Sequence, residues 1–339
     1  MTAASAGLWT LAWRRLRADR VAMASLAVVL AFLVVLMLSA FGLVASDWEA
    51  EVGVNYAPPT FVGATPVAPG TAAAVMPQQA LPDNPFDPLA DDIRALRAQL
   101  VAQHDHQGAA QRRATLPFGG DKWGHDIIKK TIKGGETSVV VGLVAALVAV
   151  ALGTLFGALS GYCGGIVDDF FNWFYSVFTA IPSVLMILAV AAVLQQKGVL
   201  TIVLILGLTG WTGPYRLMRA EYIRHRAREY VMAADAIGAS HWRRMFVHIF
   251  PNVSHVALVQ LSILAVGFIK AEVILSFLGF GVPVGVVSWG SMLNEAQNEL
   301  ILGRWWQLTA AAIAMAVLVT AFSLFTDALR DALDPRVTS

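Results

Sequence analysis

The chain has 339 residues, of which 57% are hydrophobic and only 14% are Asp, Glu, Lys or Arg. About a quarter of the residues in soluble domains are charged, so this composition excludes an ordinary soluble domain and predicts an integral membrane protein. The long apolar runs described below are expected to be transmembrane helices, which makes the expected fold class all-α. A net charge of +1 gives no basis for nucleic-acid binding. The single cysteine, Cys163, excludes an internal disulfide, and no GxxxxGK sequence followed by Ser or Thr provides a P-loop for ATP.

Residues 1–20 are predicted to form a helix in the cytoplasmic membrane interface. Aromatic and aliphatic residues alternate there with arginines, a pattern typical of interfacial helices. These residues are Trp9, Leu11, Trp13 and Leu16 with Arg14, Arg15, Arg17 and Arg20. Residues 21–46 follow as transmembrane helix 1. A signal peptide is the alternative, but the apolar run of about 24 residues exceeds a usual signal-peptide core and is long enough to span.

Residues 47–117 are predicted to form a long extracytoplasmic loop, because eight prolines between Pro58 and Pro88 interrupt any long element. Only Asp91–Gln103 could sustain a helix. The sequence His104-Asp105-His106 has a metal-binding appearance, but no further ligands lie nearby, which favours a solvated polar turn.

Residues 118–335 are predicted to contain five further spans. The second, Thr137–Ser160, carries Gly153, Gly157 and Gly161 at intervals of four, a small-residue stripe that allows close helix packing. Asp168 and Asp169 are placed in a short turn before the third span. The next spans are Phe170–Leu194, with a kink at Pro182, and Val199–Tyr215.

A polar cytoplasmic loop, residues 216–252, separates the fourth and fifth spans. Within it, Glu229–Asn252 is predicted to form two short helices with an elbow at Gly238 and an end at Pro251, because Gly is a poor helix residue and Pro breaks the helix interior. Such a folded loop is expected to be presented to another protein.

The last two spans are Val253–Phe277 and Gln307–Thr326. Lys270 and Glu272 lie near the outer end of the fifth span, where ionisable groups usually face a cavity or a partner. A re-entrant or outer loop follows, and the tryptophans near it are interpreted as an interfacial belt. They are Trp289, Trp305 and Trp306.

The distribution of basic residues predicts the orientation. Four arginines precede the first span, seven lie between Arg216 and Arg244, and Arg330 and Arg336 follow the last span, whereas the two short outer loops carry only Lys197 and Arg304. Because basic loops remain in the cytoplasm, we expect six spans with both the N and C termini cytoplasmic.

The cytoplasmic loop carries a resemblance to a known family. Ala233-Ala234, Gly238 and Pro251, thirteen residues beyond the glycine, resemble the EAA loop, or coupling helix, of ABC-importer permeases. Met232 stands where that family usually has Glu, and His248 and Phe250 replace Ile and Leu.

Three other segments resemble the same family in the same order. They begin at Pro117 (FGGDKWGHD), Ala271 (AEVILSFLGFG) and Asp327 (DALRDALDPR). In the first of them His125 replaces the usual Arg, and Gly119-Gly120 replaces Gly-Thr. The chain is therefore identified as a member of the dipeptide, oligopeptide and nickel branch of these permeases, and it resembles the C-type subunit most.

The resemblance implies a type I ABC-importer permease fold in the bacterial inner (plasma) membrane. It also implies a complex with a second homologous permease, two ATPase subunits and an extracytoplasmic substrate-binding protein that delivers peptide. ATP and magnesium would bind to the ATPase subunits, with no cofactor in this chain.

The expected docking surface for the ATPase consists of Tyr230, Met232, Ala233, Ala234, Asp235 and Gly238. Arg243 and Arg244 are predicted either to pair with the ATPase or to anchor the loop at the lipid surface. Candidates for the translocation pathway or its gate, for which helix packing is an equal alternative, are Trp211, Gln260, Lys270 and Glu272.

The sequence leaves three alternative functions open. The first is a permease for nickel chelates or other small solutes. The second is a self-contained secondary transporter, although we find no inverted repeat. The third is a membrane enzyme that uses Ser160 and His255, although no motif supports this pair.

Overall fold

The computed structural model describes residues 8–63, 112–194, 196, 198–283 and 285–333. Within these residues the regular structure is helical, and other backbone pairing is limited to isolated bridges. The elements are α1 (Leu8–Ala18), α2 (Arg20–Ala40), α4 (Ile127–Cys163), α5 (Gly165–Thr179), α6 (Ser183–Leu194), α7 (Val199–Thr209), α8 (Thr212–Arg226), α9 (Glu229–Ala236), the π-helix η1 (Arg243–Ile249), α10 (Phe250–Phe277), α11 (Trp289–Ile301) and α12 (Trp306–Leu333). The predicted all-α fold is confirmed for this part of the chain.

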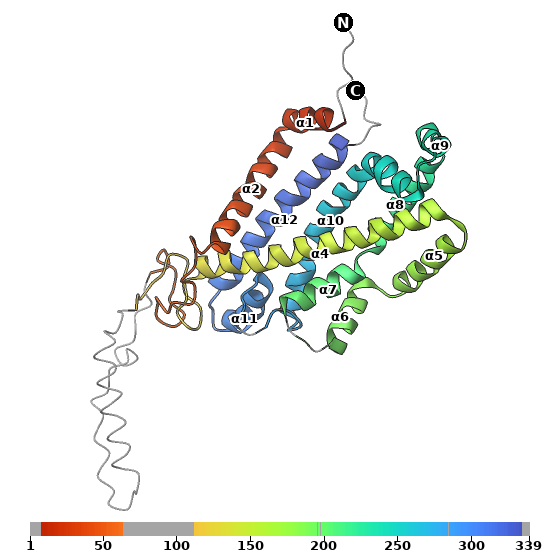
Figure 1. Ribbon diagram of the computed structural model, residues 1–339. Coiled ribbons are helices and arrows are strands. Elements are labelled where there is room, and N and C mark those ends of the chain that lie inside the picture. The colour runs from red at the N-terminus through yellow and green to blue at the C-terminus, as the bar shows by residue number, and fades with distance from the viewer. Residues whose placement is uncertain (1–7, 64–111, 195, 197, 284, 334–339) are drawn as a thin grey trace, which may run out of the picture.

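Helix α4 is the central element of the bundle. It has 37 residues and packs against α7, α8 and α10 (Figure 1). Helices α2 and α12 lie side by side, and α1 folds over the end of α12 (Figure 1). An apolar cluster that includes Leu16, Leu329 and Leu333 holds α1 in this place.

Four helices are long and apolar enough to cross a membrane, namely α2, α4, the continuous η1–α10 helix and α12. Helices α5 and α6 meet the same criterion only as a pair bent by 84°. Helix α7 has 11 residues, about 17 Å of helix, which is shorter than the bilayer core of about 30 Å. By helix length, the described residues thus provide four spans, or five with the bent pair.

The predicted third span, Phe170–Leu194, is wrong in its shape. The bend of 84° between α5 and α6 is a break rather than a kink, and it lies at Pro182, which has no N–H for the helix ladder. Helix α5 also begins earlier than predicted, so Asp168 and Asp169 lie within it and not in a preceding turn.

The predicted fourth span, Val199–Tyr215, is also interrupted. Helix α7 ends at Thr209, with Gly210 as its C-terminal cap, and α8 begins at Thr212. Pro214 lies in the first turn of α8, where a missing N–H removes no helical hydrogen bond.

The glycine stripe on α4 acts as predicted. A β-carbon added to Gly157 would lie 2.8 Å from the backbone oxygen of Tyr215, and one added to Gly161 would lie 2.6 Å from that of Arg219. These distances are too short for any real side chain, so α4 and α8 are in backbone contact.

Pro251 does not end a helix, contrary to the prediction. It lies in the first turn of α10, which continues from η1 without a break. The backbone N–H of Phe250 bonds to the carbonyl of Met245, five residues back. The π-helical hydrogen bonding therefore extends to the residue before Pro251. Proline has no N–H to donate to the helical hydrogen bonds at this point.

The two ends of the 47–117 segment are joined by backbone bridges between Gly53 and Arg113 and between Pro59 and Leu116. Residues 64–111, with the helix predicted for Asp91–Gln103 and the sequence His104-Asp105-His106, lie outside the described residues, as do residues 334–339.

The predicted tryptophan belt is wrong for two of its three members. Trp289 and Trp306 are buried, and their indole N–H groups donate to the carbonyls of Thr131 (2.9 Å) and Gly120 (2.7 Å). Trp289 begins α11, which was not predicted, and Trp306 begins α12; of the three tryptophans, Trp305 is the exposed one.

Candidate functional site

The elbow, defined here as α8, α9 and η1, is the first candidate site. Its turn follows from one residue, Gly238, which has φ +82°. The N–H of Gly238 bonds to the carbonyl of Asp235 (2.9 Å), and that of Ala239 to the carbonyl of Ala234 (3.0 Å). This pair of bonds satisfies the last carbonyls of α9 and defines a Schellman turn, which needs a left-handed residue at its centre.

The inner face of α9 fastens it to the bundle. Val231 and Ala234 are buried, and Val231 belongs to an apolar cluster with Met218 and Tyr222 of α8 and Met245 of η1. The hydroxyl of Tyr222 donates to the carbonyl of Met245 (3.2 Å). A force applied to α9 is therefore transmitted to α8 and η1, because these contacts are made inside one core.

The outer face of α9 is apolar and open. Met232 is 55% exposed, Ile237 is 84% exposed and Tyr230 is 37% exposed. Ala233 and Gly238 are also exposed, whereas Ala234 faces inward. Of the residues expected to dock the ATPase, the structure thus brings all but Ala234 to the surface.

The two arginines of the elbow have different surroundings. Arg244 forms an ion pair with Asp235 and donates to Nδ1 of His241 (3.0 Å). Arg243 is exposed. Arg244 therefore links η1 to α9 through this ion pair, whereas Arg243 faces solvent.

A polar clamp connects the elbow to α5. The guanidinium of Arg219 donates two hydrogen bonds of 2.6 Å each to the carboxylate of Asp168. Ser160 also donates to this carboxylate, and its hydroxyl lies 3.1 Å from that of Tyr215. The bidentate pair is the strong form of an ion pair, and it links α8 directly with α5 beside the end of α4.

The serine–histidine enzyme site receives no support from this geometry. The recorded partners of Ser160 are Asp168 and Tyr215 rather than His255. Across the described ranges, no group of three or more His, Cys, Asp or Glu side chains is arranged to hold a metal ion.

The candidates for the pathway differ in burial. Trp211 lies in an aromatic cluster, 5.2 Å from the ring of Phe174, and Glu272 is fully buried and accepts from Ser276 at 2.6 Å. Gln260 is half-buried and Lys270 is exposed. Within this chain, Trp211 and Glu272 pack between helices, and Gln260 and Lys270 remain accessible.

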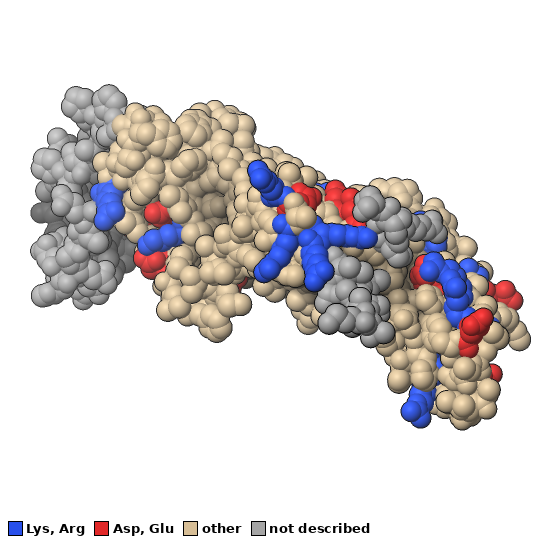
Figure 2. Space-filling model, turned by 90° about the horizontal axis from the view of Figure 1, so that it is seen from above, with Lys and Arg blue, Asp and Glu red and all other residues tan. Residues whose placement is uncertain are grey.

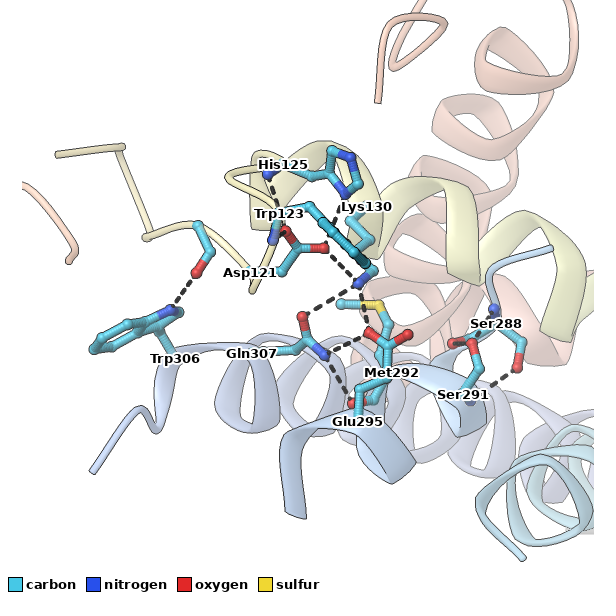
Figure 3. Close-up of polar contacts among 11 residues, drawn as sticks. Asp121, Trp123, His125, Lys130, Ser288, Ser291, Met292, Glu295, Trp306 and Gln307 are labelled. Carbon is cyan, nitrogen blue, oxygen red and sulfur yellow. Dashed lines mark hydrogen bonds and ion pairs between the residues drawn. The ribbon is translucent and has the colours of Figure 1, made fainter. Parts of the chain in front are cut away.

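A second polar site, which we call the outer cluster, lies where the start of α4 meets α11 and α12 (Figure 3). The amine of the buried Lys130 donates to Asp121 (2.8 Å), Glu295 (2.7 Å) and Gln307 (3.4 Å). Nδ1 of His125 lies 2.9 Å from Asp121. The cluster ties three segments far apart in the sequence to one cation.

Asp121 of the outer cluster and Glu299, which lies beside it on α11, have pKa values displaced from the ordinary range. Burial alone would raise the pKa of Asp121, but Lys130 and hydrogen bonds from His125 outweigh it, and the pKa lies below its ordinary value. Burial raises the pKa of Glu299 to about 7. Both oxygens of Glu299 lack a hydrogen-bond partner, which is consistent with a neutral carboxyl group.

The outer cluster and the clamp were not predicted from the sequence. Lys130 precedes the predicted second span, and Glu295 lies between the predicted fifth and sixth spans. Asp168 and Arg219 are 51 residues apart, so neither carries a local signal. A buried partner becomes visible only when helices are placed beside each other.

Comparison with known proteins gives two matches to family models. Residues 153–339 match the family described as "Binding-protein-dependent transport system inner membrane component". Residues 7–59 match the "N-terminal TM domain of oligopeptide transport permease C". The first match covers more than half of the chain and includes the whole elbow.

Three curated relatives show the extent of the similarity. The oligopeptide transport system permease protein OppC of Bacillus subtilis (strain 168) is 32% identical over 251 residues, 72% of this chain and 82% of the relative. The dipeptide transport system permease protein DppC of Lactococcus lactis subsp. cremoris (strain MG1363) is 30% identical over 328 residues, covering 96% and 90%. The peptidoglycan transport system permease protein YejE of Agrobacterium fabrum (strain C58 / ATCC 33970) is 34% identical over 236 residues, covering 68% and 61%.

Proposed function

The chain belongs to the family of binding-protein-dependent transport system inner membrane components, and from this premise we propose that it forms half of the translocation pathway of an ATP-driven peptide importer. The observation that carries the proposal is the elbow. It presents the apolar residues Met232 and Ile237 to solvent while Val231 holds α9 in the bundle. A chain of this family without a P-loop receives its energy through such a surface.

We propose six spans with both termini in the cytoplasm. The bent α5–α6 pair and the α7–α8 pair would supply the third and fourth spans beside the four long helices. Figure 1 places α1, the end of α12 and α9 toward one end of the molecule. Figure 2 looks onto that end and shows clusters of Lys and Arg, and the exposed Arg14 and Arg17 of α1 support its cytoplasmic placement.

The ATPase contact is proposed to include Tyr230, Met232, Ala233, Asp235, Gly238 and Arg243, with Ala234 and Arg244 supporting α9 from behind. Closure of two ATPase subunits would push α9, and the shared core would carry this motion to α8 and η1. A push shifts the conformational equilibrium only if the ATPase contacts differ between the two states.

The second permease subunit is proposed to cover α5 and α6. Helix α5 has no buried residue, and α6 has only Ala191. The break between these helices leaves backbone groups that lipid cannot satisfy, so protein or a water-filled path must face them. Two permeases, two ATPases that bind ATP and magnesium, and an extracytoplasmic binding protein complete the importer in the bacterial inner membrane.

Peptide is the proposed cargo, because the names of the relatives refer to oligopeptide, dipeptide and peptidoglycan transport. A nickel chelate is the alternative cargo within the same family. A self-contained secondary transporter is the alternative mechanism, and it would give the exposed face of α9 no role.

Affinity purification of the tagged chain from its native membrane tests the assembly. We expect an ATPase subunit and a second permease to co-purify, and we expect hydrolysis of ATP by the complex to rise with loaded binding protein. Recovery of the chain alone, together with uptake driven by an ion gradient, would contradict the proposal.

A further inference from the structure

A hollow of about 680 Å³ lies between the end of α4 and the elbow. Its lining includes Tyr162, Cys163, Arg226, Met232, Asp235 and Arg244. It opens beside the exposed face of α9, because Met232 belongs both to that face and to the lining. Anything that docks on α9 is therefore beside the hollow.

Arg226 is an exposed cation of the lining that has no carboxylate partner among the residues that the structure describes. Arg244 is paired with Asp235, so these two charges compensate each other. The guanidinium of Arg226 lies 6.0 Å from the centre of the Tyr162 ring, and no carboxylate within the described residues pairs with it. The arginine is held at the C-terminal end of α4, where the helix dipole favours a positive charge.

We propose that the hollow receives an Asp or Glu side chain of the ATPase subunit, which pairs with Arg226. This inference rests on the proposed function and names the chemistry of the partner. A protein side chain is favoured over a lipid phosphate because α9 itself forms one wall of the hollow, and α9 is the helix that the ATPase covers.

The chain provides its own probe, because Cys163 is its single cysteine, lies in the lining and is exposed. The rate at which a maleimide labels Cys163 would be measured by mass spectrometry in nanodiscs that hold the permease pair, with and without bound ATPase. We expect bound ATPase to slow labelling about tenfold or more, the effect of excluding solvent from a filled pocket.

A pair of variants tests the charge. We expect Arg226→Gln to weaken ATPase binding about tenfold, with a smaller dependence on salt, and Arg226→Lys to retain most of the binding. The matched control is Arg224→Gln, since Arg224 is exposed on the same helix and pairs with Glu221 at 3.2 Å. It should change binding less than about twofold.

The outcomes separate this inference from the proposed function. A wild-type complex that retains no ATPase contradicts the proposed function itself. Two results would overturn only the inference. In the first, the complex retains the ATPase while Cys163 is labelled at an unchanged rate. In the second, Arg226→Gln binds the ATPase as tightly as Arg224→Gln does. Protection of Cys163 by anionic lipid without ATPase overturns it as well and assigns the hollow to the membrane surface.

Discussion

Glu299 lies on α11 beside the outer cluster, and its pKa is displaced toward neutral pH. Its pKa is raised from 4.5 to about 7, first because burial disfavours the charged form and then because Asp121 and Glu295 repel it. Lys130 and Lys122 oppose this shift. A raised carboxyl pKa contributes stability below the unfolded value of 4.5, and this contribution is lost as the pH rises through 7.

We predict that Glu299→Gln stabilises the protein above pH 7 and has little effect below pH 4.5. The gain at pH 8 should be on the order of 3 kcal/mol, the free energy that corresponds to a shift of about 2.5 pKa units. Thermal unfolding of the purified protein at both pH values measures it. Glu295→Gln is the contrasting variant, because it removes the 2.7 Å partner of Lys130 and should destabilise at pH 8. Equal effects of Glu299→Gln at both pH values would contradict the account.

Gly238 permits a direct test of the elbow. Its φ of +82° is closed to proline, which is locked near −65°, but open to asparagine. We predict that Gly238→Pro inserts normally yet loses transport and uncouples ATP hydrolysis from substrate, whereas Gly238→Asn retains most of both activities. Uptake and hydrolysis in membrane vesicles measure the two variants. Normal uptake by Gly238→Pro would show that the turn is dispensable.

Single residues show where sequence reasoning succeeds and where it stops. The turn at Gly238 could be predicted, because a glycine that follows a run of helix-forming residues commonly ends a helix. The burial of Trp289 and Trp306 could not be predicted. The residues next to a tryptophan in the sequence can be the same whether it lies at the membrane interface or in the protein interior. Their hydrogen-bond acceptors, Thr131 and Gly120, are more than 150 residues away.

At the level of elements, the clamp between Asp168 and Arg219 joins the elbow to α5 with two hydrogen bonds of 2.6 Å. We predict that Asp168→Asn and Arg219→Gln each lower the number of peptides imported per ATP at least about threefold without loss of ATPase binding, since a bidentate pair is worth more than an exposed one. The exchange Asp168→Arg with Arg219→Asp should restore part of the coupling. If both single variants import as many peptides per ATP as the wild type, the clamp has no role in coupling.

Element boundaries were predictable where a helix is long and uniform. The stripe of Gly153, Gly157 and Gly161 predicted a close contact for α4, and the structure has it against α8. The predictions were wrong where the backbone is broken or widened. The bend of 84° after α5 and the passage of η1 through Pro251 depend on neighbouring helices, because proline alone is compatible with a kink, a break or a helix start.

For the whole molecule, the family and the membrane character could be obtained from the sequence, but the exposed side of the bundle could not. Composition describes which residues are apolar and not whether lipid or protein covers them. The structure locates the uncovered region on α5 and α6, which bury only Ala191 between them. This exposure supports the proposal that a second permease subunit covers these two helices.

The central claim is that a separate ATPase moves this bundle by pushing on the elbow. The most direct measurement is uptake of radiolabelled peptide into proteoliposomes that contain this chain, its partner permease and loaded binding protein, with and without the ATPase subunits. We predict uptake only when the ATPase subunits and ATP are both present, and none under an imposed proton or sodium gradient alone. Gradient-driven uptake in the absence of the ATPase would contradict the account.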